Sequence, residues 1–415
     1  MASELPRLAD GGIYEKLGVR PIINGRSNST VLGGSTPSPT VRAAMEEAGR
    51  YWVEMAELMR RTGDHISSLL GTEATHPTAG CAAAIILSSA VAMTGDDRQR
   101  MAQLPDTTGM KNEILIQSPH RYWVQTCFQF AGARLRAVGT AGGCTAEQLE
   151  DAVDDNTAGI AFALSHPPGY LFPHHDDMVS LADAAAIGRR NDVPVVVDAN
   201  AQIYPLQAFR RNAQAADLVC FGGKYFGSSH ATGFVTGRAD LVDAVRQLDF
   251  VGSIPYDTTN DGARKVGALT GIPTGSGYAF GRGMKLDRQQ VVALAVATDE
   301  WFRIDHDARR ADYRRRMAVV QEAVADITGV TTKAVPVDSY LLERLEISLA
   351  PSLGASAEQI VADLDAGAPR IVLGLSQDDE QTLFMSPHIL APGEERVVAS
   401  QLRSVLLVRA CSARA

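Results

Sequence analysis

The stretch Pro194–Gly237, PVVVDANAQIYPLQAFRRNAQAADLVCFGGKYFGSSHATGFVTG, decides how the chain folds. It holds two short apolar runs, Val195–Val197 and Leu218–Phe221, whose branched side chains predict strands buried on both faces. Asp198 directly follows the first run, and Lys224 lies shortly after the second. Because the carboxyl ends of parallel strands open onto the edge of the sheet where ligands bind, we expect this acid and this amine to share a site.

Pyridoxal phosphate chemistry needs this pair of side chains. A lysine amine holds the aldehyde of the cofactor as a Schiff base, and a carboxylate keeps the pyridine nitrogen protonated so that the ring accepts electrons. Gly222 and Gly223 would let the backbone pass close to a flat ring. The alternative is that Asp198 caps the next helix and Lys224 is a solvated loop residue, since polar residues are common at strand ends.

A second signal lies in the segment His76–Leu87, where small residues precede a predicted helix. The backbone N–H groups of Ala79, Gly80 and Cys81 would form a phosphate site with the helix dipole, and Thr78 would add a hydroxyl. The segment lacks the sequence of a Walker loop and of a dinucleotide-binding turn. The alternative is plain packing of helix on sheet, with Cys81 as a small buried apolar residue.

His120 follows a third predicted strand, Glu113–Gln117, and therefore belongs to the same edge of the sheet. Its imidazole would stack on a pyridine ring, with Tyr122 or Trp123 as substitutes. The alternative is a histidine hydrogen-bonded within its turn. The run His174–Asp177 is interpreted as a polar helix start and not as a metal site, because consecutive residues rarely point at one ion.

The strands and helices alternate up to about residue 290, which predicts an α/β fold with a mainly parallel sheet. The sequence is helical in character from Val41 to Leu70 and from Leu286 to about Ile327. Beyond Val330 the pattern changes to α+β, and Ser356 and Gln359 have the spacing of a capping box. We therefore expect an N-terminal arm at 1–40, a large domain at 41–290, and a linking helix with a small C-terminal domain at 291–415. The basic run Arg314–Arg316 is interpreted as a solvated helix face.

The composition excludes several classes of protein. The chain has 415 residues, more than one core usually supports, and its 45% hydrophobic and 21% charged residues are ordinary for a soluble enzyme. A net charge of -9 offers no basic face to nucleic acid. Five cysteines without paired spacing indicate a reducing, cytoplasmic setting. Neither a secretory signal nor a membrane-spanning run is seen.

Taken in order, these signals resemble the pyridoxal phosphate enzymes of the aspartate aminotransferase fold, known as fold type I. More narrowly, the chain resembles the selenocysteine synthase-like group that includes D-glucosaminate-6-phosphate ammonia-lyase. The stretches that carry the resemblance are Leu32–Ser35, Thr78–Ala84, Gln129–Leu135, Val197–Gln202, the Lys224 loop and Gly281–Lys285. The resemblance implies a three-layer, mainly parallel, seven-stranded sheet with a smaller α+β C-terminal domain.

The resemblance also implies roles for single residues. Lys224 would form the Schiff base and move the proton at the substrate α-carbon, while Asp198 would pair with the pyridine nitrogen. Residues 78–81 would hold the phosphate, and His120 would lie on the ring face. The remaining cofactor contacts implied by the matching stretches are Gln202 and Gly223.

Substrate contacts are implied less directly. Arg282 is the candidate for an anionic group of the substrate, although an arginine after glycine is also a common loop residue. Members of the group pair as homodimers with the site between subunits, so Asn24, Arg26 and Tyr256 would reach in from the partner.

Two departures limit what the resemblance implies. The segment around Lys224 is shorter than in many relatives, and near Arg370–Gly374 the arginine expected after the strand is displaced or missing. The N-terminal tRNA-binding domain and the basic surface of selenocysteine synthase are also not visible, so tRNA is rejected as substrate.

We therefore expect α,β-elimination, of the ammonia-lyase type, on a small amino-acid or amino-sugar-acid substrate. β-Replacement, aldol cleavage, transamination and racemisation stay open because they share the same activated α-carbon. A catalytically silent scaffold and a nucleotide-dependent dehydrogenase are the alternatives from other classes, and the second lacks its glycine fingerprint.

Overall fold

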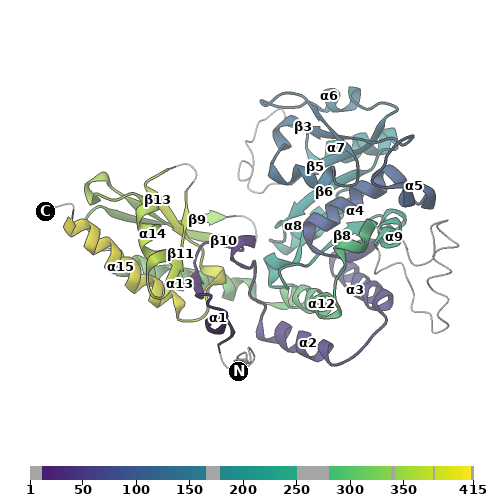
Figure 1. The fold of residues 1–415 in the computed structure, drawn as a ribbon. Coiled ribbons are helices and arrows are strands. Elements are labelled where there is room, and N and C mark those ends of the chain that lie inside the picture. The colour runs from purple at the N-terminus through teal and green to yellow at the C-terminus, as the bar shows by residue number, and fades with distance from the viewer. Residues whose placement is uncertain (1–11, 165–177, 250–279, 338–341, 377–378, 413–415) are drawn as a thin grey trace, which may run out of the picture. The chain divides into compact units, whose positions relative to one another are not determined.

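The computed structural model describes residues 12–164, 178–249, 280–337, 342–376 and 379–412. They form two compact units, coloured along the chain in Figure 1. The larger unit takes its described residues from 35–304, and the smaller unit takes them from 1–34, 305–337 and 341–415. The domain boundaries expected from the sequence, 1–40, 41–290 and 291–415, stay a proposal.

The larger unit is built on one seven-stranded sheet with the order β2-β8-β7-β6-β5-β3-β4. Only β8 runs antiparallel to its neighbours, so the predicted mainly parallel α/β sheet is confirmed. The strands, in chain order, are β2 Ala74–Thr78, β3 Glu113–Gln117, β4 Arg134–Val138, β5 Thr157–Ala163, β6 Val195–Asn200, β7 Leu218–Gly222 and β8 Gly233–Gly237. Apolar burial explains its centre, because every residue of β5 and β7 is buried.

Helices pack on the strands of this sheet. One of them, α4 Gly80–Thr94, is apolar around most of its surface because it packs against both the sheet and α9 Ala239–Leu248. The other helices of the unit are α2 Pro39–Gly49, α3 Met55–Leu70, α5 Arg98–Gln103, α6 Ala146–Asp151, α7 Leu181–Asn191, α8 Leu206–Ala213 and α12 Arg288–Arg303. Short 3-10 turns follow strand ends at η2 Ser118–His120 and η4 Gly223–Phe226.

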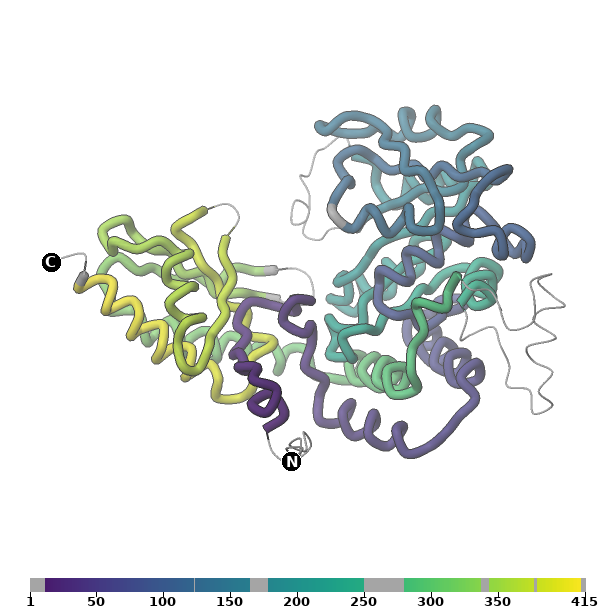
Figure 2. The backbone as a smooth tube through the Cα atoms, in the orientation of Figure 1, coloured from purple at the N-terminus to yellow at the C-terminus, as the bar shows by residue number. Residues whose placement is uncertain are grey.

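Two predicted helices are each divided in two. The helical run expected over 41–70 forms α2 and α3, and Figure 2 traces the bend between them. The run expected over 286–327 breaks where Asp305 caps α13 His306–Val324, accepting hydrogen bonds from the backbone N–H groups of Asp307 and Ala308. An aspartate that accepts first-turn N–H groups begins a new helix instead of continuing the old one.

Strand β2 of the larger unit was not predicted, and neither were β9 Val330–Val337 and β13 Thr382–Met385 of the smaller unit. The β2 sequence Ala-Thr-His-Pro-Thr contains a proline, which cannot donate to a strand ladder. The proline is tolerated because β2 is an edge strand: among the described strands it pairs with β8 alone. Its direction matches that of the parallel strands, since β8 is antiparallel to both β2 and β7.

The smaller unit is α+β, as expected. Its antiparallel sheet has the order β12-β13-β10-β9, and β1 pairs in parallel with β11 in a separate ladder. The strands are β1 Ile22–Asn24, β9 Val330–Val337, β10 Leu342–Leu349, β11 Arg370–Val372, β12 Gly374–Leu375 and β13 Thr382–Met385. Helices α13, α14 Ala357–Ala366 and α15 Glu394–Ser412 supply the other part of its core. The predicted capping box of α14, formed by Ser356 and Gln359, is present.

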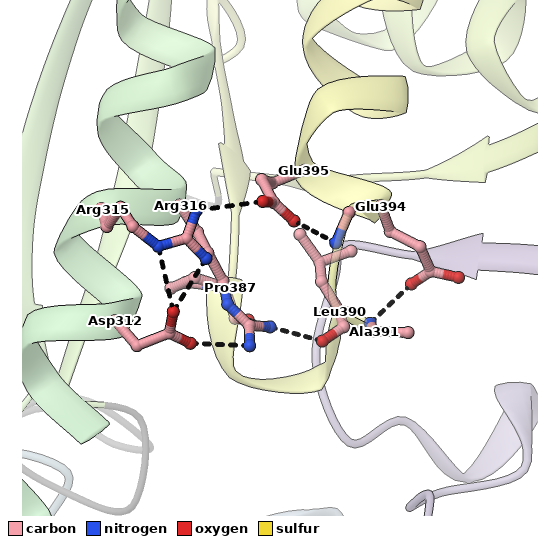
Figure 3. Close-up of polar contacts among 9 residues, drawn as sticks. Asp312, Arg315, Arg316, Pro387, Leu390, Ala391, Glu394 and Glu395 are labelled. Carbon is pink, nitrogen blue, oxygen red and sulfur yellow. Dashed lines mark hydrogen bonds and ion pairs between the residues drawn. The ribbon is translucent and has the colours of Figure 1, made fainter. Parts of the chain in front are cut away.

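The run Arg314–Arg316 is only partly the solvated face that the sequence suggested. Arg316 has 12% of its side chain exposed and pairs with Asp312, while its guanidinium also donates to the carbonyls of Pro387 and Leu390 (Figure 3). Arg315 pairs with Glu395 at the start of α15. These arginines therefore stabilise the packing of α13 on neighbouring segments, which a one-element pattern does not reveal.

The five cysteines are all free thiols. Among the described helices, none combines the length and apolar character needed to cross a membrane.

Candidate active site

Asp198 lies near the carboxyl end of β6 and has 5% of its surface exposed. One carboxylate oxygen, Oδ2, accepts a hydrogen bond from the Tyr122 hydroxyl. The other, Oδ1, accepts from the Cys81 thiol at 3.3 Å. Burial raises the pKa of the Asp198 carboxyl, and the two donors oppose that rise. Neither donor is charged. The Asp198 carboxyl therefore has no counter-ion among these two neighbours and could pair with a cationic group.

The end of β6 is shaped by an irregularity in its pairing. The register with β7 shifts between Asp198 and Asn200, and Asn200 adopts a positive φ of 29°. Such a bulge bends a strand and redirects its side chains, and asparagine tolerates this conformation better than most residues. The Asn200 amide donates to the Tyr225 hydroxyl at 3.0 Å, which ties the bulge to the turn that carries Lys224.

Lys224 lies in η4, the turn that follows β7, and is half-buried. Burial lowers the pKa of its ammonium group, and the nearby Cys81 opposes that shift. Its Nζ lies 4.9 Å from the centre of the Tyr225 ring. A lowered pKa favours the neutral amine, which is the form that reacts with a carbonyl.

Gly223 permits this turn to pack tightly. A Cβ added there would lie 2.3 Å from Thr232 Oγ1. Gly233, at the start of β8, is as constrained, because its Cβ would lie 2.6 Å from the carbonyl carbon of Gly80. Both glycines therefore let the Lys224 turn and the Gly80 turn come together with β8 between them.

The predicted phosphate turn lies at the start of α4. Thr78 ends β2, Ala79 is the N-cap residue, and α4 begins at Gly80 with a positive φ of 83°. No side chain caps the first N–H groups of α4 in the described structure, while the Thr78 hydroxyl donates to the Gly80 carbonyl at 3.0 Å. Together with the small side chains, these N–H groups suit an anionic ligand better than a packed, capped helix start would.

His120 ends η2 and is 2% exposed. Its ring meets Phe162 edge-on at 4.6 Å between centroids, and its Nδ1 accepts from the Ala163 backbone N–H at 3.3 Å. Burial lowers the pKa of the imidazole to about 3, so the ring is neutral near pH 7. Gln117 holds the turn, since its side chain exchanges two hydrogen bonds of 3.1 Å with the backbone of Val179.

The structure brings most of the predicted cofactor residues to one edge of the sheet. Thr78, His120, Asp198 and Lys224 come from the carboxyl ends of β2, β3, β6 and β7, and the Cys81 thiol contacts Asp198. Gln202, 5% exposed, follows the end of β6. Their assignment to a cofactor stays a proposal.

The predicted substrate residues are placed less decisively. Tyr256 lies outside the described residues, as does the run His174–Asp177. Arg282 is exposed in η5 Phe280–Met284. Within the smaller unit, the Asn24 side chain accepts from the Arg26 backbone N–H at 3.0 Å and closes its own turn. Their substrate roles stay a proposal.

The arginine that begins β11 has a structural partner. Arg370 pairs with Asp365 at 2.8 Å, from the preceding helix α14. This ion pair engages the guanidinium within the smaller unit.

Sequence reasoning missed the contact between Tyr122 and Asp198. Tyr122 was considered only as a substitute for the ring-stacking histidine, yet its hydroxyl meets the carboxylate directly. The available signal was its position two residues past the end of η2, at the same edge of the sheet as the end of β6. Tyr225 was missed as well, although it directly follows Lys224.

Comparison with known proteins gives relatives along nearly the whole chain. The chain is 29% identical to 5'-C-glycyluridine monooxygenase-decarboxylase from Streptomyces sp over 402 residues, covering 95% of this chain and 92% of that protein. It is 26% identical to D-glucosaminate-6-phosphate ammonia lyase from Salmonella typhimurium over 401 residues, covering 95% and 97%. No protein-family model matches the chain.

A solved structure of D-glucosaminate-6-phosphate ammonia-lyase superposes with a TM-score of 0.79 at 26% identity, covering 97% of this chain and all of that one. The predicted resemblance and the predicted fold are therefore confirmed.

Proposed function

We propose that this chain, which shares the fold of D-glucosaminate-6-phosphate ammonia-lyase, is a pyridoxal phosphate-dependent lyase. It would act at the α-carbon of a small amino-acid or amino-sugar-acid substrate. The observation that carries the proposal is the group at the carboxyl edge of the sheet. A half-buried amine of lowered pKa, a buried carboxylate without a charged partner among its two donors, and an uncapped helix start lie together there.

The residues fit this cofactor on the structure's own terms. Lys224 would hold its aldehyde carbon, Asp198 its ring nitrogen, and the α4 turn from Ala79 to Cys81 its phosphate. The glycines at 223 and 233 keep side chains out of the space between these turns. When bound, pyridoxal phosphate supplies an electron sink for charge that develops at the substrate α-carbon.

The side chains would divide the work between them. Lys224 Nζ, with its lowered pKa, would accept the α-proton and return it to the product. Asp198 would keep a positive charge on the ring nitrogen, and its burial would strengthen that interaction by excluding water. His120, neutral near pH 7, would place an uncharged ring against the cofactor. It would therefore not draw the developing negative charge away from the pyridine ring.

Elimination is preferred among the possible outcomes because a relative matched over nearly its whole length is named an ammonia lyase of an amino-sugar acid. The other relative is named a monooxygenase-decarboxylase, which makes oxidative loss of a carboxyl group the second candidate. β-Replacement, aldol cleavage and transamination start from the same activated carbon and stay as further alternatives. A catalytically silent scaffold would have no need of a half-buried lysine whose pKa is lowered, as that of Lys224 is.

The cellular setting is proposed with the function. We propose a cytoplasmic homodimer with a small-molecule substrate, since the five thiols are free and the chain carries a net charge of -9. A partner subunit would contribute to the site through Asn24, Arg26 and Tyr256.

A screen of amino acids and amino-sugar acids tests the reaction. Protein loaded with pyridoxal phosphate is assayed for ammonia and keto-acid release, with oxygen uptake and carbon dioxide measured in parallel. Ammonia and keto acid in equal amounts, lost in Lys224→Ala, support elimination. Oxygen uptake with carbon dioxide would move the second candidate to first place, and turnover that survives in Lys224→Ala would contradict the proposal.

A further inference from the structure

The loop that follows Lys224 carries a second titratable side chain, His230. The turn η4 ends at Gly227, whose positive φ of 83° bends the chain back, and β8 begins at Gly233. His230 lies between these two glycines. Because η4 follows the carboxyl end of β7, the loop belongs to the ligand edge of the sheet.

Hydrogen bonds close this loop onto the turn that carries the lysine. The Gly223 N–H donates to the Thr232 carbonyl at 2.8 Å, and the Ser228 N–H donates to the Gly223 carbonyl at 3.1 Å. The buried Thr232 hydroxyl lies 2.8 Å from Ser228 Oγ, and the Ser35 hydroxyl donates to the Ser228 carbonyl. Both ends of the loop are therefore fixed beside Gly223, the residue that precedes Lys224.

The imidazole of His230 is half-buried and interacts with Lys224. Its Nδ1 is buried and has no hydrogen-bond partner within the part of the chain that the structure describes. Burial lowers the pKa of the ring, and the positive charge of the Lys224 ammonium lowers it further. Buried polar atoms in proteins are nearly always paired, so a ring nitrogen without a partner beside a reactive amine points to a chemical role.

Other histidines of the larger unit have different neighbours. Nε2 of His65 and Nε2 of His76 each meet a carboxylate, while Nδ1 of His120 accepts a backbone N–H. His230 instead meets the cationic group of Lys224. A carboxylate makes an imidazolium hold its proton, whereas a neighbouring cation makes it give the proton up. His230 is therefore a stronger acid, when protonated, than an ordinary histidine.

Elimination needs two separate proton transfers. In the proposed function Lys224 accepts the α-proton and returns it to the product, so the group that leaves the β-carbon needs a proton from another acid. The Tyr122 hydroxyl and the Cys81 thiol both contact Asp198, the proposed partner of the ring nitrogen. Burial raises the pKa of both groups, which makes them poor acids.

We infer that His230 is a second catalytic residue of the proposed elimination, the acid that protonates the leaving group at the β-carbon. The inference rests on the proposed function. Lys224 Nζ takes the α-proton, and the electron pair of that C–H bond forms a double bond between the α- and β-carbons. The bond from the β-carbon to its leaving oxygen breaks, and its electron pair stays on the oxygen. That oxygen takes the proton of the His230 imidazolium, which becomes a neutral imidazole.

An NMR titration tests whether His230 faces Lys224, and it needs no turnover. The full chain, labelled with ¹³C at the histidine Cε1 atoms, is titrated before pyridoxal phosphate is added, and His230→Gln assigns the signal. We expect the pKa of His230 to be below its ordinary value of 6.5 and to rise toward it in Lys224→Met, which removes the charge. Lys111→Met is the matched control, because Lys111 is exposed before the amino end of β3, at the opposite edge of the sheet.

A kinetic comparison separates the two proton transfers. Serine and β-chloroalanine, each as both enantiomers, are given to the protein loaded with pyridoxal phosphate in deuterium oxide. His230→Gln should slow ammonia release from serine about 10²-fold and slow α-proton exchange, which reports on Lys224, less than about threefold. Release from β-chloroalanine should fall less than about fivefold, because chloride leaves without a proton. His65→Gln, at a partly exposed histidine of α3, should leave all three rates unchanged.

Each measurement has a result that would overturn the inference. An unchanged titration of His230 in Lys224→Met would show that the two side chains do not face each other. Equal losses of α-proton exchange and ammonia release in His230→Gln would indicate a structural role, and undiminished ammonia release from serine would indicate no role. Borohydride labelling of Lys224 in His230→Gln reports separately on the proposed function, so the two failures are distinguishable.

Discussion

Two buried carboxylates of the larger unit, Asp198 and Asp249, have opposite surroundings. Asp249, 3% exposed at the end of α9, meets His76 Nε2 at 2.7 Å, and His76 on β2 is fully buried. Asp198, 5% exposed at the end of β6, accepts side-chain hydrogen bonds from a phenol and a thiol, which are both neutral donors. The comparison shows how a fold distinguishes its acids: one has a basic partner within the chain, and the other meets neutral donors and can accept a cationic group of a ligand.

Removing the charge of Asp198 should have the largest effect. Asp198→Asn keeps the shape of the side chain, so we expect the folded protein to melt within a few degrees of the unmodified chain. Turnover should fall about 10²- to 10³-fold, as when one preorganised electrostatic contact is lost. The measurement is kcat on the substrate found by the ammonia screen, with thermal melting as the control. Unchanged kcat would show that Asp198 is no more functional than Asp249.

The reverse result is expected for the other carboxylate. His76→Leu leaves Asp249 buried without the imidazole, which should lower the free energy of unfolding by about 3 kcal/mol. Urea unfolding measures it, and the absorbance of bound cofactor should be unchanged in the folded fraction. His65→Leu is the matched control, because His65 meets Asp299 at 3.4 Å with both side chains partly exposed and should change stability by less than about 0.5 kcal/mol. Equal effects of the two variants would remove the structural role assigned to His76.

His120 adds a pH dependence to the site. Burial lowers its pKa to about 3 in the folded protein, against about 6.5 in an unfolded chain. The unfolded chain therefore binds the proton first, and the contribution of neutral His120 is complete above about pH 6.5 and is lost as the pH falls toward 3. His120→Gln should reduce this loss of stability by about 2 kcal/mol between pH 7 and pH 4, measured by urea unfolding at each pH. Parallel curves for the two proteins would show that His120 charges normally in the fold.

The smallest effect is expected at the Cys81 thiol. Burial raises the pKa of this thiol well above its ordinary value, so it meets Asp198 as a neutral, weak donor and not as a nucleophile. Cys81→Ala should change kcat less than about threefold. A loss as large as that of Asp198→Asn would give Cys81 a chemical role of its own and remove the contrast between the charged and neutral members of the site.

The sequence predicts this site well where chemistry and strand pattern coincide. Apolar runs ending at Asp198 and before Lys224 are local signals, and the structure places both residues at the expected edge. Strand β2 was not predicted because Pro77 is atypical of a strand, and because its pairing depends on β8, which is distant in the sequence. The contact of Tyr122 was not predicted for a similar reason, since its partner Asp198 is distant in the sequence. Contacts between elements depend on topology, which residue patterns within one element do not encode.

The most direct test of the central claim is the absorbance spectrum of the purified protein with pyridoxal phosphate, before and after borohydride reduction, followed by peptide mapping. We predict a visible band that reduction abolishes, with the reduced pyridoxyl label on Lys224 and none in Lys224→Ala. A label on another lysine, or no band even with excess cofactor, would contradict the assignment of Lys224 and Asp198 and favour a scaffold that has the fold without the chemistry.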